Sequence, residues 1–420
     1  MDKVDLNLNL IAKRHYDVIV AGGGVAGVAA AVTAATHGLS VLLLEKSNIL
    51  GGLSTLGLVN LFVPMCNGNG KQIIFGLSEK WLRMSAEIGY NTIPPEWKNG
   101  QPEFPTPVRY MQRYSTYIFA LQLLEEVERA GVDLLYDCIA TLPVMDGSIC
   151  TGIVTNSKSG LELYSCRYLV DTTGDADLMR RSGMPTVKGE NFYSYFGKMI
   201  TLDSVRSVNE SGDLSQLYAG KAYGGTINLF GDNQPSDIPR WSGLTVEEVT
   251  EYLKVNQLEM LKNVRSYPKA TAEIAQFPLM PNFRTTCHIS GEYSLGIEDC
   301  YHHFDDSICA INDFEHRFHL FEVPYRTLYS KRFPNIITAG RSADGHGYGW
   351  DLLRVIPPAI LTGQAAGEAV YQAITSGTAI PDVNIHDLQN ALEKQDVLIH
   401  FPDEYVPDDK SVVIHGKKYN

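Results

Sequence analysis

The sequence predicts an α/β protein in which one sheet-and-helix unit is divided along the chain by a second, inserted unit. Near the N-terminus, an apolar run ending at Val20 leads into closely spaced glycines, an Ala-rich segment and a second apolar run. Residues 333–374 return to this texture, with an apolar run, a glycine-rich loop and a helix that carries small residues. Residues 190–324 instead alternate aromatic, strand-like pieces with polar turns. We therefore expect a Rossmann-like domain, discontinuous in sequence, with an inserted antiparallel α+β domain.

The first glycines, Gly22, Gly24 and Gly27, have the G-x-G-x-x-G spacing of a dinucleotide-binding turn. In such a turn the first glycine permits a tight bend, the second lets backbone approach a pyrophosphate, and the third lets helix and strand pack closely. The following helix directs its N–H groups and its dipole at the phosphates. Glu45 ends the second apolar run, where its carboxylate can accept hydrogen bonds from ribose hydroxyls and repel a 2′-phosphate. Five glycines, two threonines and a histidine within residues 17–46 argue against the alternative, a membrane-spanning helix.

Two further turns can approach the same ligand. Gly51 and Gly52 form a second glycine pair, which can bring N–H groups to the pyrophosphate but can equally be a flexible turn. An apolar strand ending at Val170 then breaks into a turn that begins at Asp171 and continues Thr-Thr-Gly-Asp. Backbone at this strand-to-turn transition can also approach a bound cofactor.

Helix and strand patterns account for the remaining chain. Residues 132–170 have the pattern of β-rich runs separated by turns, and residues 91–110 that of a surface excursion rich in Pro, Asn and Gly. One helix opens with a capping box, in which Glu248 follows Thr245 by three residues. The predicted helices cover residues 76–90 (capped near Ser78), 113–131, 245–264, 357–374 and, in the tail, 387–395.

Composition limits the compartment and the partners. At 420 residues the chain is long enough for two domains, and 44% hydrophobic and 20% charged residues are ordinary for a globular protein. The net charge of −13 disfavours nucleic acid and anionic membranes as partners. Residues 1–17 contain no apolar core of an export signal, so we expect a cytoplasmic protein. Seven cysteines without any C-x-x-C disfavour a disulfide framework, a zinc site and an iron–sulfur cluster, so we expect no bound metal.

Taken together, the motif regions resemble FAD-dependent oxidoreductases of the glutathione-reductase-like superfamily. Within that superfamily, the chain is most similar to bacterial flavoproteins related to the flavin subunit of heterodisulfide reductase and to the fumarate-reductase group. The resemblance rests on the N-terminal glycines with Glu45, on the pair Gly51 and Gly52, on residues 173–175, and on the C-terminal strand, loop and G-Q-A-A-G helix. It implies a glutathione-reductase-type FAD-binding domain with FAD as its cofactor.

The resemblance also implies a role for each motif. The glycines would hold the pyrophosphate, Glu45 the adenosine ribose, and the backbone around Ile139 the adenine. The start of the C-terminal helix would face the pyrimidine edge of the flavin, where the helix dipole favours the anionic reduced form. The cofactor-binding candidates are Gly22, Gly24, Gly27, Glu45, Lys46, Gly51, Gly52, Ser54, Ile139, Thr173, Gly174, Asp175, Gly340, Arg341, Pro358 and Ala359.

Three departures narrow this expectation. Disulfide reductases of the superfamily carry C-x-x-x-x-C after the glycine pair, whereas this chain has Leu53, Ser54, Thr55 and Leu56 there. Relatives often have Asp or Glu at the position of Arg341. The cysteine runs that hold clusters in heterodisulfide-reductase relatives are missing. Because a second G-x-G-x-x-G for NAD(P)H is also missing, we expect hydride to be exchanged directly with a substrate in the inserted domain.

The loop 342–354 supplies the first catalytic candidates, because it precedes the helix expected to face the flavin. His346 can be the acid or base that handles the accompanying proton, or a hydrogen-bonded loop histidine. Arg354 can bind a carboxylate or stabilise reduced flavin, or it can pair with Asp344 or Asp351.

The inserted domain supplies the others. Arg284 and His288 would share one face if R-T-T-C-H is a strand, and they would then form a substrate clamp rather than the solvated charges of an edge strand. His303 lies in an H-H-F-D-D run that resembles a metal cluster, although we expect the solvated face of an amphipathic helix. We expect His346, Arg354 and Arg284 to line one cavity beside the flavin. Tyr325 and a candidate reactive thiol, Cys66, are further candidates.

These observations favour an oxidoreductase that transfers hydride between flavin N5 and a small organic substrate, which can carry a carboxylate. Two alternatives stay open: a flavoprotein subunit that passes electrons to a partner in a larger complex, and an FAD-binding protein with a non-redox role. The expected domains are FAD-binding (1–75, 105–190 and 325–380), substrate or cap (76–104 and 191–324) and a C-terminal tail (381–420).

Overall fold

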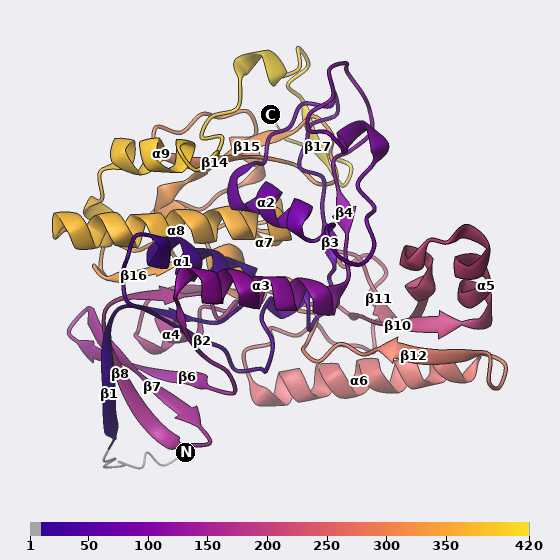
Figure 1. Ribbon diagram of the computed structural model, residues 1–420, viewed down its shortest axis with the longest axis horizontal. Helices are drawn as coiled ribbons and strands as arrows, with labels where there is room; N and C mark the ends of the chain where they lie inside the picture. The colour runs from indigo at the N-terminus through magenta and orange to yellow at the C-terminus, as the bar shows by residue number, and fades with distance from the viewer. Residues whose placement is uncertain (1–9, 420) are drawn as a thin grey trace.

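The computed structural model describes residues 10–419 and is centred on one twisted sheet (Figure 1). Its strands are β1 (Ile11–Ala21), β2 (Val41–Leu44), β5 (Asp133–Leu135), β6 (Ile139–Asp146), β7 (Ile149–Ser157), β8 (Gly160–Asp171) and β16 (Ile336–Thr338). The order is β5-β2-β1-β8-β7-β6. Strand β16 pairs with residues 169–171 of β8, beyond residues 160–165, with which β7 pairs. Strands β5, β2, β1, β8 and β16 are parallel, whereas β7 and β6 form an antiparallel extension. The predicted Rossmann-like α/β class is therefore confirmed.

The register of the parallel strands brings their carboxyl ends to one edge. Leu44 pairs with Ala21, Ala21 with Asp171, and Asp171 with Thr338. Residues that follow these four positions are therefore neighbours in space although they come from distant parts of the chain. Ligands of open α/β sheets bind outside this edge.

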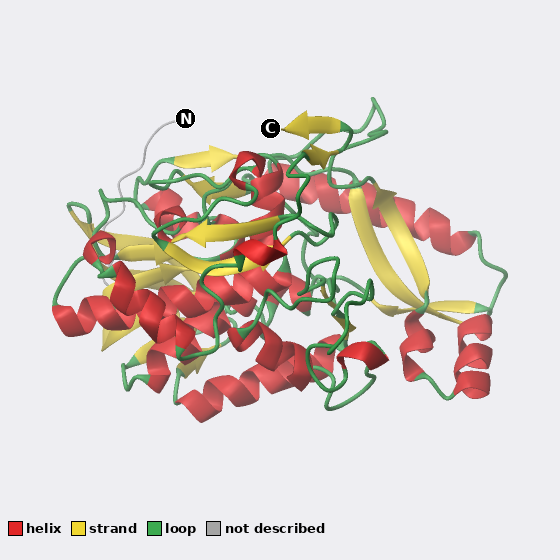
Figure 2. Ribbon diagram, turned by 90° about the horizontal axis from the view of Figure 1, so that it is seen from above, coloured by secondary structure: helices red, strands yellow, loops and turns green. Residues whose placement is uncertain are grey.

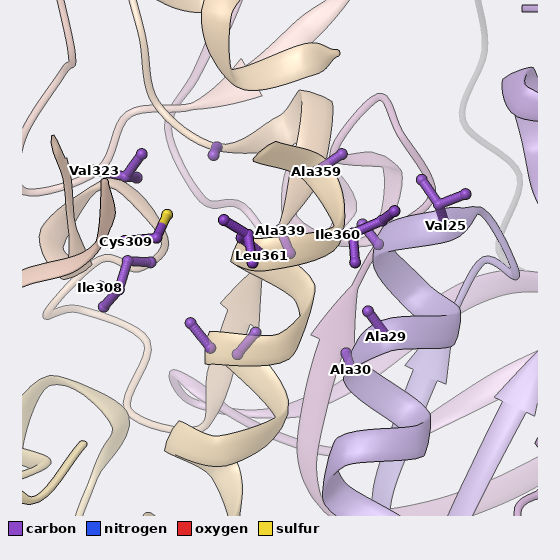
Figure 3. Packing of buried hydrophobic residues seen from close by; sticks show 14 of the residues in the cluster. Val25, Ala29, Ala30, Ile308, Cys309, Val323, Ala339, Ala359, Ile360 and Leu361 are labelled. Atoms are coloured by element: carbon purple, nitrogen blue, oxygen red, sulfur yellow. The ribbon is translucent and has the colours of Figure 1, made fainter. Parts of the chain in front are cut away.

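Two helices, α1 (Val25–Thr36) and α8 (Ile356–Ser376), pack against each other beside the sheet. Figure 3 shows Ala29 and Ala30 of α1 directed at α8, whose opposite side faces the hairpin of β14 (Ser307–Asn312) and β15 (Leu320–Pro324). A Cβ atom at Gly363 would lie 2.2 Å from the backbone oxygen of Ala26. The small residues of the C-terminal motif therefore set the distance between the helices.

The inserted unit is built on a second sheet, in the order β11-β10-β12 (Figure 2). It comprises β10 (Ser194–Thr201), α5 (Leu202–Ser211), β11 (Gly220–Thr226), α6 (Val246–Arg265) and β12 (Ala272–Gln276). Tyr252 and Met260 of α6 share a buried cluster with Tyr195 and Met199 of β10, so α6 covers one face of this sheet. Thr245 caps α6 by accepting a hydrogen bond from the N–H of Glu248, which is half of the predicted capping box; the Glu248 carboxylate instead accepts from the hydroxyl of Ser242 and the N–H of Gly243.

The other elements connect or cover these two units. They are β3 (Leu61–Phe62), α2 (Gly76–Met84), β4 (Gln112–Arg113), α3 (Thr116–Ala130), α4 (Asp177–Arg181), β9 (Thr186–Lys188), β13 (Cys287–Ile289), α7 (Tyr348–Arg354), α9 (Ile385–Glu393), β17 (Val412–Ile414) and β18 (Lys417–Tyr419). Within residues 10–419, no helix combines the length and the apolar character needed to cross a membrane.

Three local expectations were wrong. The helix at 76–90 begins at Gly76 without a side-chain cap, because the Ser78 hydroxyl donates to the backbone oxygen of Pro357 instead. The segment R-T-T-C-H is a strand only from Cys287 onward, so Arg284 lies outside it. The H-H-F-D-D run is not helical; it is a turn that leads into β14. In each case a tertiary contact replaced the local pattern.

The packing also bears on the proposed domain boundaries. Trp81 and Trp97, both fully buried, belong to the same core cluster as α1 and α8. The hairpin of β14 and β15 belongs to that cluster too. The separate cluster of the inserted unit extends only from Tyr193 to Phe283. These contacts favour an inserted unit smaller than residues 191–324, with residues 76–104 packed into the sheet domain.

Candidate functional site

The first glycine turn has the close approaches that a phosphate-binding turn needs. Gly22 has a φ of +106°, and a Cβ atom there would lie 2.4 Å from the backbone oxygen of Thr172. A Cβ atom at Gly27 would lie 1.9 Å from the oxygen of Gly22. A Cβ atom at Gly24, in contrast, would meet nothing within 4 Å. The backbone of Gly24 therefore faces open space at the start of α1, where a pyrophosphate would lie.

The second glycine pair packs directly on the first. The N–H of Gly51 donates to the backbone oxygen of Gly23 at 2.8 Å, and Gly51 forms a bridge with Gly24. A Cβ atom at Gly52 would lie 3.3 Å from the Cα of Gly24. The buried hydroxyl of Ser54 donates to the oxygen of Gly51 at 2.7 Å and thereby holds the second turn. The two turns thus form one cradle.

Glu45 connects this cradle to the end of β2. One carboxylate oxygen accepts a hydrogen bond from the N–H of Gly23 at 2.8 Å, and the other accepts from the N–H of Ser47 at 2.7 Å. The backbone oxygen of Glu45 accepts from the N–H of Cys138, which brings the start of β6 at Ile139 to the same edge. The contacts bring Glu45 and Ile139 to one edge of the sheet, and their binding of the adenosine half stays a prediction.

The turn at 173–175 is fixed by Arg341. Its guanidinium donates to the backbone oxygen of Gly174 at 2.7 Å, to the backbone oxygen of Phe283 at 2.7 Å, and to the carboxylate of Asp175 at 2.8 Å. Phe283 belongs to the core of the inserted unit. Arg341 therefore ties the inserted unit to the cofactor edge of the sheet.

Charges around this turn are balanced. Burial raises the pKa of Asp175, while the positive charges of Arg341 and of the exposed Lys46 oppose that rise. Thr173 donates its hydroxyl hydrogen to the buried carboxylate of Asp171 at 2.7 Å. The hydroxyl of Thr173 and the guanidinium of Arg341 are thus occupied by contacts within the protein.

The glycine-rich loop after β16 meets the start of α8. Gly340 has a φ of +70°, and a Cβ atom there would lie 3.0 Å from the Cβ of Ala26 and 3.6 Å from that of Ala359. Its N–H donates to the Thr362 hydroxyl, which also donates to the oxygen of Pro358. The first turns of α1 and α8 therefore lie close together, with the loop of Gly340 between them. This geometry, with the open space at Gly24, fits a dinucleotide that passes from the cradle toward the start of α8.

A comparison with known families decides the identity of the cofactor. The family model described as "FAD dependent oxidoreductase" matches residues 17–217 and 227–392. The chain belongs to this family. FAD is its cofactor, and the protein is an FAD-dependent oxidoreductase.

Relatives of this FAD-dependent oxidoreductase match only parts of it. The digeranylgeranylglycerophospholipid reductase of Methanoculleus marisnigri is 27% identical over 185 residues, which are 42% of this chain and 43% of that protein. The vinyl phenol reductase of Lactiplantibacillus plantarum is 62% identical over 47 residues, 11% of this chain and 10% of that one. The chain thus spans less than half the length of these relatives.

Solved structures share only low identity with the chain. A geranylgeranyl bacteriochlorophyll reductase-like protein from Thermoplasma acidophilum is similar over 93% of this chain and 94% of its own, with 13% identity and a TM-score of 0.39. The flavin-dependent brominase Bmp2 is similar over 90% of this chain and 84% of its own, with 15% identity and a TM-score of 0.41.

Two of the three catalytic candidates lie near enough for the charge of one to act on the other. The partly buried guanidinium of Arg284 donates to the hydroxyl of Ser194 at 3.1 Å and to the backbone oxygen of Ile227 at 3.3 Å. Burial, and then the positive charge of Arg354, lower the pKa of Arg284 to about 10. Arg354 lies 2.6 Å from the carboxylate of Asp351. In the described part of the chain, no Asp or Glu oxygen lies within 4.0 Å of Arg284.

The third candidate has partners of its own. His346 Nε2 lies 2.8 Å from a carboxylate oxygen of Glu298, and Nδ1 lies 3.2 Å from the hydroxyl of Ser294. Its side chain is 54% exposed. The His346 side chain thus forms its polar contacts with residues 294–298, and none is recorded with Arg284 or Arg354 in the described part of the chain.

Sequence reasoning missed a polar cluster centred on Asp313. The segment that carries this cluster also contributes negative charge near Arg284. The buried carboxylate of Asp313 lies 3.0 Å from His316 Nδ1 and 3.3 Å from His319 Nδ1, and it accepts a hydrogen bond from the Tyr348 hydroxyl at 2.7 Å. Burial alone would raise the pKa of Asp313, but these hydrogen bonds hold it well below its usual range. Glu315, in the same segment, contributes negative charge at Arg284. In the sequence, the D-x-x-H-x-x-H spacing of Asp313, His316 and His319 was the signal that could have identified this cluster.

The remaining candidates have structural contacts. His303 lies 2.5 Å from the fully buried carboxylate of Glu322, which also lies 3.0 Å from His400 of the tail. His288 is buried 3.2 Å from Asp344, and Tyr325 donates to the backbone oxygen of Ile380. Cys66 is buried as well, and burial raises the pKa of its thiol, which disfavours a reactive thiolate. The contact of Glu322 with His400 ties the C-terminal tail to β15.

Proposed function

We propose that this enzyme transfers hydride between FAD and a small organic substrate that carries a carboxylate, and that Arg284 and Arg354 bind this carboxylate. The observation that carries the proposal is the guanidinium of Arg284, which is partly buried, is affected by the charge of Arg354, and has no carboxylate oxygen within ion-pair distance among residues 10–419. The carboxylates of Asp351 and Glu315 act on Arg284 only from beyond ion-pair distance, so its guanidinium can still bind an anionic ligand, and the planar guanidinium fork matches a carboxylate.

Bound FAD supplies the hydride acceptor or donor. The chain's own residues position the substrate. Ser194 and the backbone oxygen of Ile227 orient Arg284 from the inserted unit, and Asp351 orients Arg354 from the segment that leads into α8. A substrate carboxylate bound by both would therefore lie between the inserted unit and the start of α8.

Two histidines are candidates for the proton step. His346 is the candidate from the sequence. His316 is a second candidate, because the hydrogen bond that its ring donates to the Asp313 carboxylate raises the pKa of His316 and favours its protonated form. The Tyr348 hydroxyl holds the other oxygen of Asp313, which fixes the orientation of the pair.

The direction of the reaction that we propose is reduction. Both curated relatives are named reductases, one for a digeranylgeranyl lipid and one for a vinyl phenol. A geranylgeranyl group and a vinyl group both contain carbon–carbon double bonds. These names support an alkene, and Arg284 supports a carboxylate, so alkenes that carry a carboxylate are the first substrate class to test.

The test uses photoreduced holoenzyme without oxygen. Unsaturated carboxylic acids and their methyl esters are mixed with it, and reoxidation is followed by flavin absorbance. We expect the acids to reoxidise the flavin with at least about tenfold lower half-saturation than the esters, and Arg284→Gln to remove this difference. Arg240→Gln is the control, because Arg240 is an exposed arginine that pairs with Glu190. Equal behaviour of acids and esters would contradict the carboxylate assignment.

A further inference from the structure

A second cationic feature lies where the inserted unit meets the sheet domain. It is a cavity of about 250 Å³ between β10 and β11 on one side and the segment of β3 and β4 on the other. Figure 1 shows β3 and β4 next to β11. The residues that line it are Leu58, Val59, Asn60, Leu61, Tyr90, Arg113, Phe196, Lys198, Ser215, Tyr218 and Lys221.

The lining carries three positive charges and no Asp or Glu. Lys198 is only 6% exposed, yet no described hydrogen bond or salt bridge involves its ammonium group. The ammonium group of Lys221, an exposed residue, lies over the ring of Phe196, at 5.5 Å from its centroid. Buried lysines are rarely unpaired, because removing an ammonium ion from water is costly. In a chain of net charge −13, a cavity with only positive charges is a specific feature.

We propose that this cavity binds a phosphate or diphosphate group, with Lys198, Lys221 and Arg113 as its counter-charges. A phosphate monoester carries about −1.5 to −2 charge and three acceptor oxygens at neutral pH, which matches three converging donors better than a single carboxylate does. Three hydroxyls also line the cavity. Those of Tyr90 and Ser215 donate to the backbone oxygen of Tyr114 and to Asp213, whereas that of Tyr218 can donate to a remaining phosphate oxygen.

The position of the cavity connects it to the proposed substrate site. Ser194, Phe196 and Lys198 alternate along β10 and therefore point to the same face of the sheet, opposite the face that α6 covers. Arg284 donates to Ser194 on this face. Ser194 and Lys198 are four residues apart, or about 13 Å along a strand. If the proposed function holds, a substrate bound by its carboxylate at Arg284 could place a distal phosphate in this cavity.

The charge state of Lys198 makes the proposal measurable. Burial, and then the charges of Arg113 and Lys221, lower the pKa of Lys198 to about 8. Tyr90 and Tyr218 are the other titratable groups that face it, and burial raises the pKa of Tyr90. A bound anion would raise the pKa of Lys198 again. Anion affinity should therefore be highest below pH 8 and fall as the pH rises through 8, as Lys198 loses its proton in the free cavity.

Isothermal titration calorimetry of the holoenzyme with pyrophosphate tests the proposal directly. We expect binding at pH 7 that is tighter than at pH 9 by a factor approaching about ten, the limit for loss of one proton with a pKa of about 8. We expect Lys198→Met to weaken binding at pH 7 at least about tenfold, and Lys254→Met, at an exposed lysine of α6, to leave it unchanged. Lys198→Met removes an unpaired buried charge, so its melting temperature should equal or exceed that of the wild type. Pyrophosphate affinity that is insensitive to Lys198→Met would overturn the proposal.

A second arm distinguishes the source of the phosphate. Photoreduced holoenzyme is reoxidised by unsaturated carboxylates that either carry or lack a phosphorylated distal end. If the substrate carries the phosphate, we expect a lower half-saturation concentration for the phosphorylated compounds. We expect Lys198→Met to abolish this difference. A free phosphate predicts no such difference, with pyrophosphate binding intact. Failure of every carboxylate to reoxidise the flavin would count against the proposed function only, because pyrophosphate binding does not depend on turnover.

Discussion

Glu45 is the residue through which β2 and the first glycine turn are connected. Its carboxylate accepts hydrogen bonds from the N–H groups of Gly23 and Ser47 and is buried at the cofactor edge. Because hydrogen bonds hold both oxygens, the side chain already has a fixed orientation before a ribose binds, so binding costs little conformational entropy.

At this scale we predict that Glu45→Gln weakens FAD binding about tenfold or more. The amide keeps the shape of the side chain but loses the charge, and hydrogen bonds to a charged group contribute about 1.5–3 kcal/mol. Titration of apoprotein with FAD, followed by flavin fluorescence, measures the change. Glu162→Gln is the matched control, because Glu162 is a buried carboxylate of β8 that pairs with Lys13. An equal loss in both variants would indicate general destabilisation instead.

The sequence predicted residues well where the chemistry is local. Gly22, Gly27 and Glu45 belong to one strand–helix–strand unit, so their spacing alone defines their relation. Asp313 and Tyr348 could not be paired in this way, because their contact depends on how α7 packs beside β14. Convergence of His346, Arg354 and Arg284 on one cavity stays a prediction: the charge of Arg354 acts on Arg284, while the His346 side chain contacts Glu298 and Ser294.

At the scale of elements, substitution by alanine should affect protein stability at Gly363 of α8 but FAD binding at Gly24, which precedes α1. A Cβ atom at Gly363 would lie 2.2 Å from backbone of α1, whereas one at Gly24 would meet no protein atom within 4 Å. We predict that Gly363→Ala lowers the stability of the apoprotein by about 1–3 kcal/mol, because two backbones must separate. Denaturant unfolding measures this loss. An unchanged midpoint would show that α1 and α8 can shift apart freely.

For Gly24→Ala we predict unchanged apoprotein stability and loss of FAD binding. Gly24 has a φ of −64°, which any residue adopts, so the substitution adds no backbone strain. The added methyl group would occupy the space in which the pyrophosphate approaches the start of α1. Denaturant unfolding and FAD titration of the same preparation separate the two effects. Retention of FAD by this variant would contradict the assignment of the cradle.

Elements were predicted less well where a short polar or apolar run was judged by its pattern alone. The H-H-F-D-D run had a helical pattern, but the buried carboxylate of Glu322 accepts the N–H of Phe304 and lies beside His303. These contacts come from β15, which is remote in sequence. Long elements such as α6 were predicted correctly because their caps and periodicity are both local.

For the whole molecule, Arg341 is the principal polar link that we identify between the inserted unit and the cofactor edge. We predict that Arg341→Gln increases amide hydrogen exchange in residues 173–177 and 280–286 while leaving exchange in α1 and α8 unchanged. The reason is that one guanidinium donates to both segments, to the oxygen of Gly174 and to that of Phe283. Mass spectrometry of deuterated peptides measures the change. Arg206→Gln, at an exposed pair with Asp203, is the control.

The position of β8 has a consequence for how the protein is made. Asp171 at its end pairs with Ala21 from the start of the chain and with Thr338 from its last quarter, and the Thr338 hydroxyl donates to the oxygen of Asp171. A chain still on the ribosome therefore presents the glycine cradle long before β16 and α8 emerge to close it. We expect nascent chains that end before residue 336 to release FAD readily, and retention to begin only once α8 has left the exit tunnel.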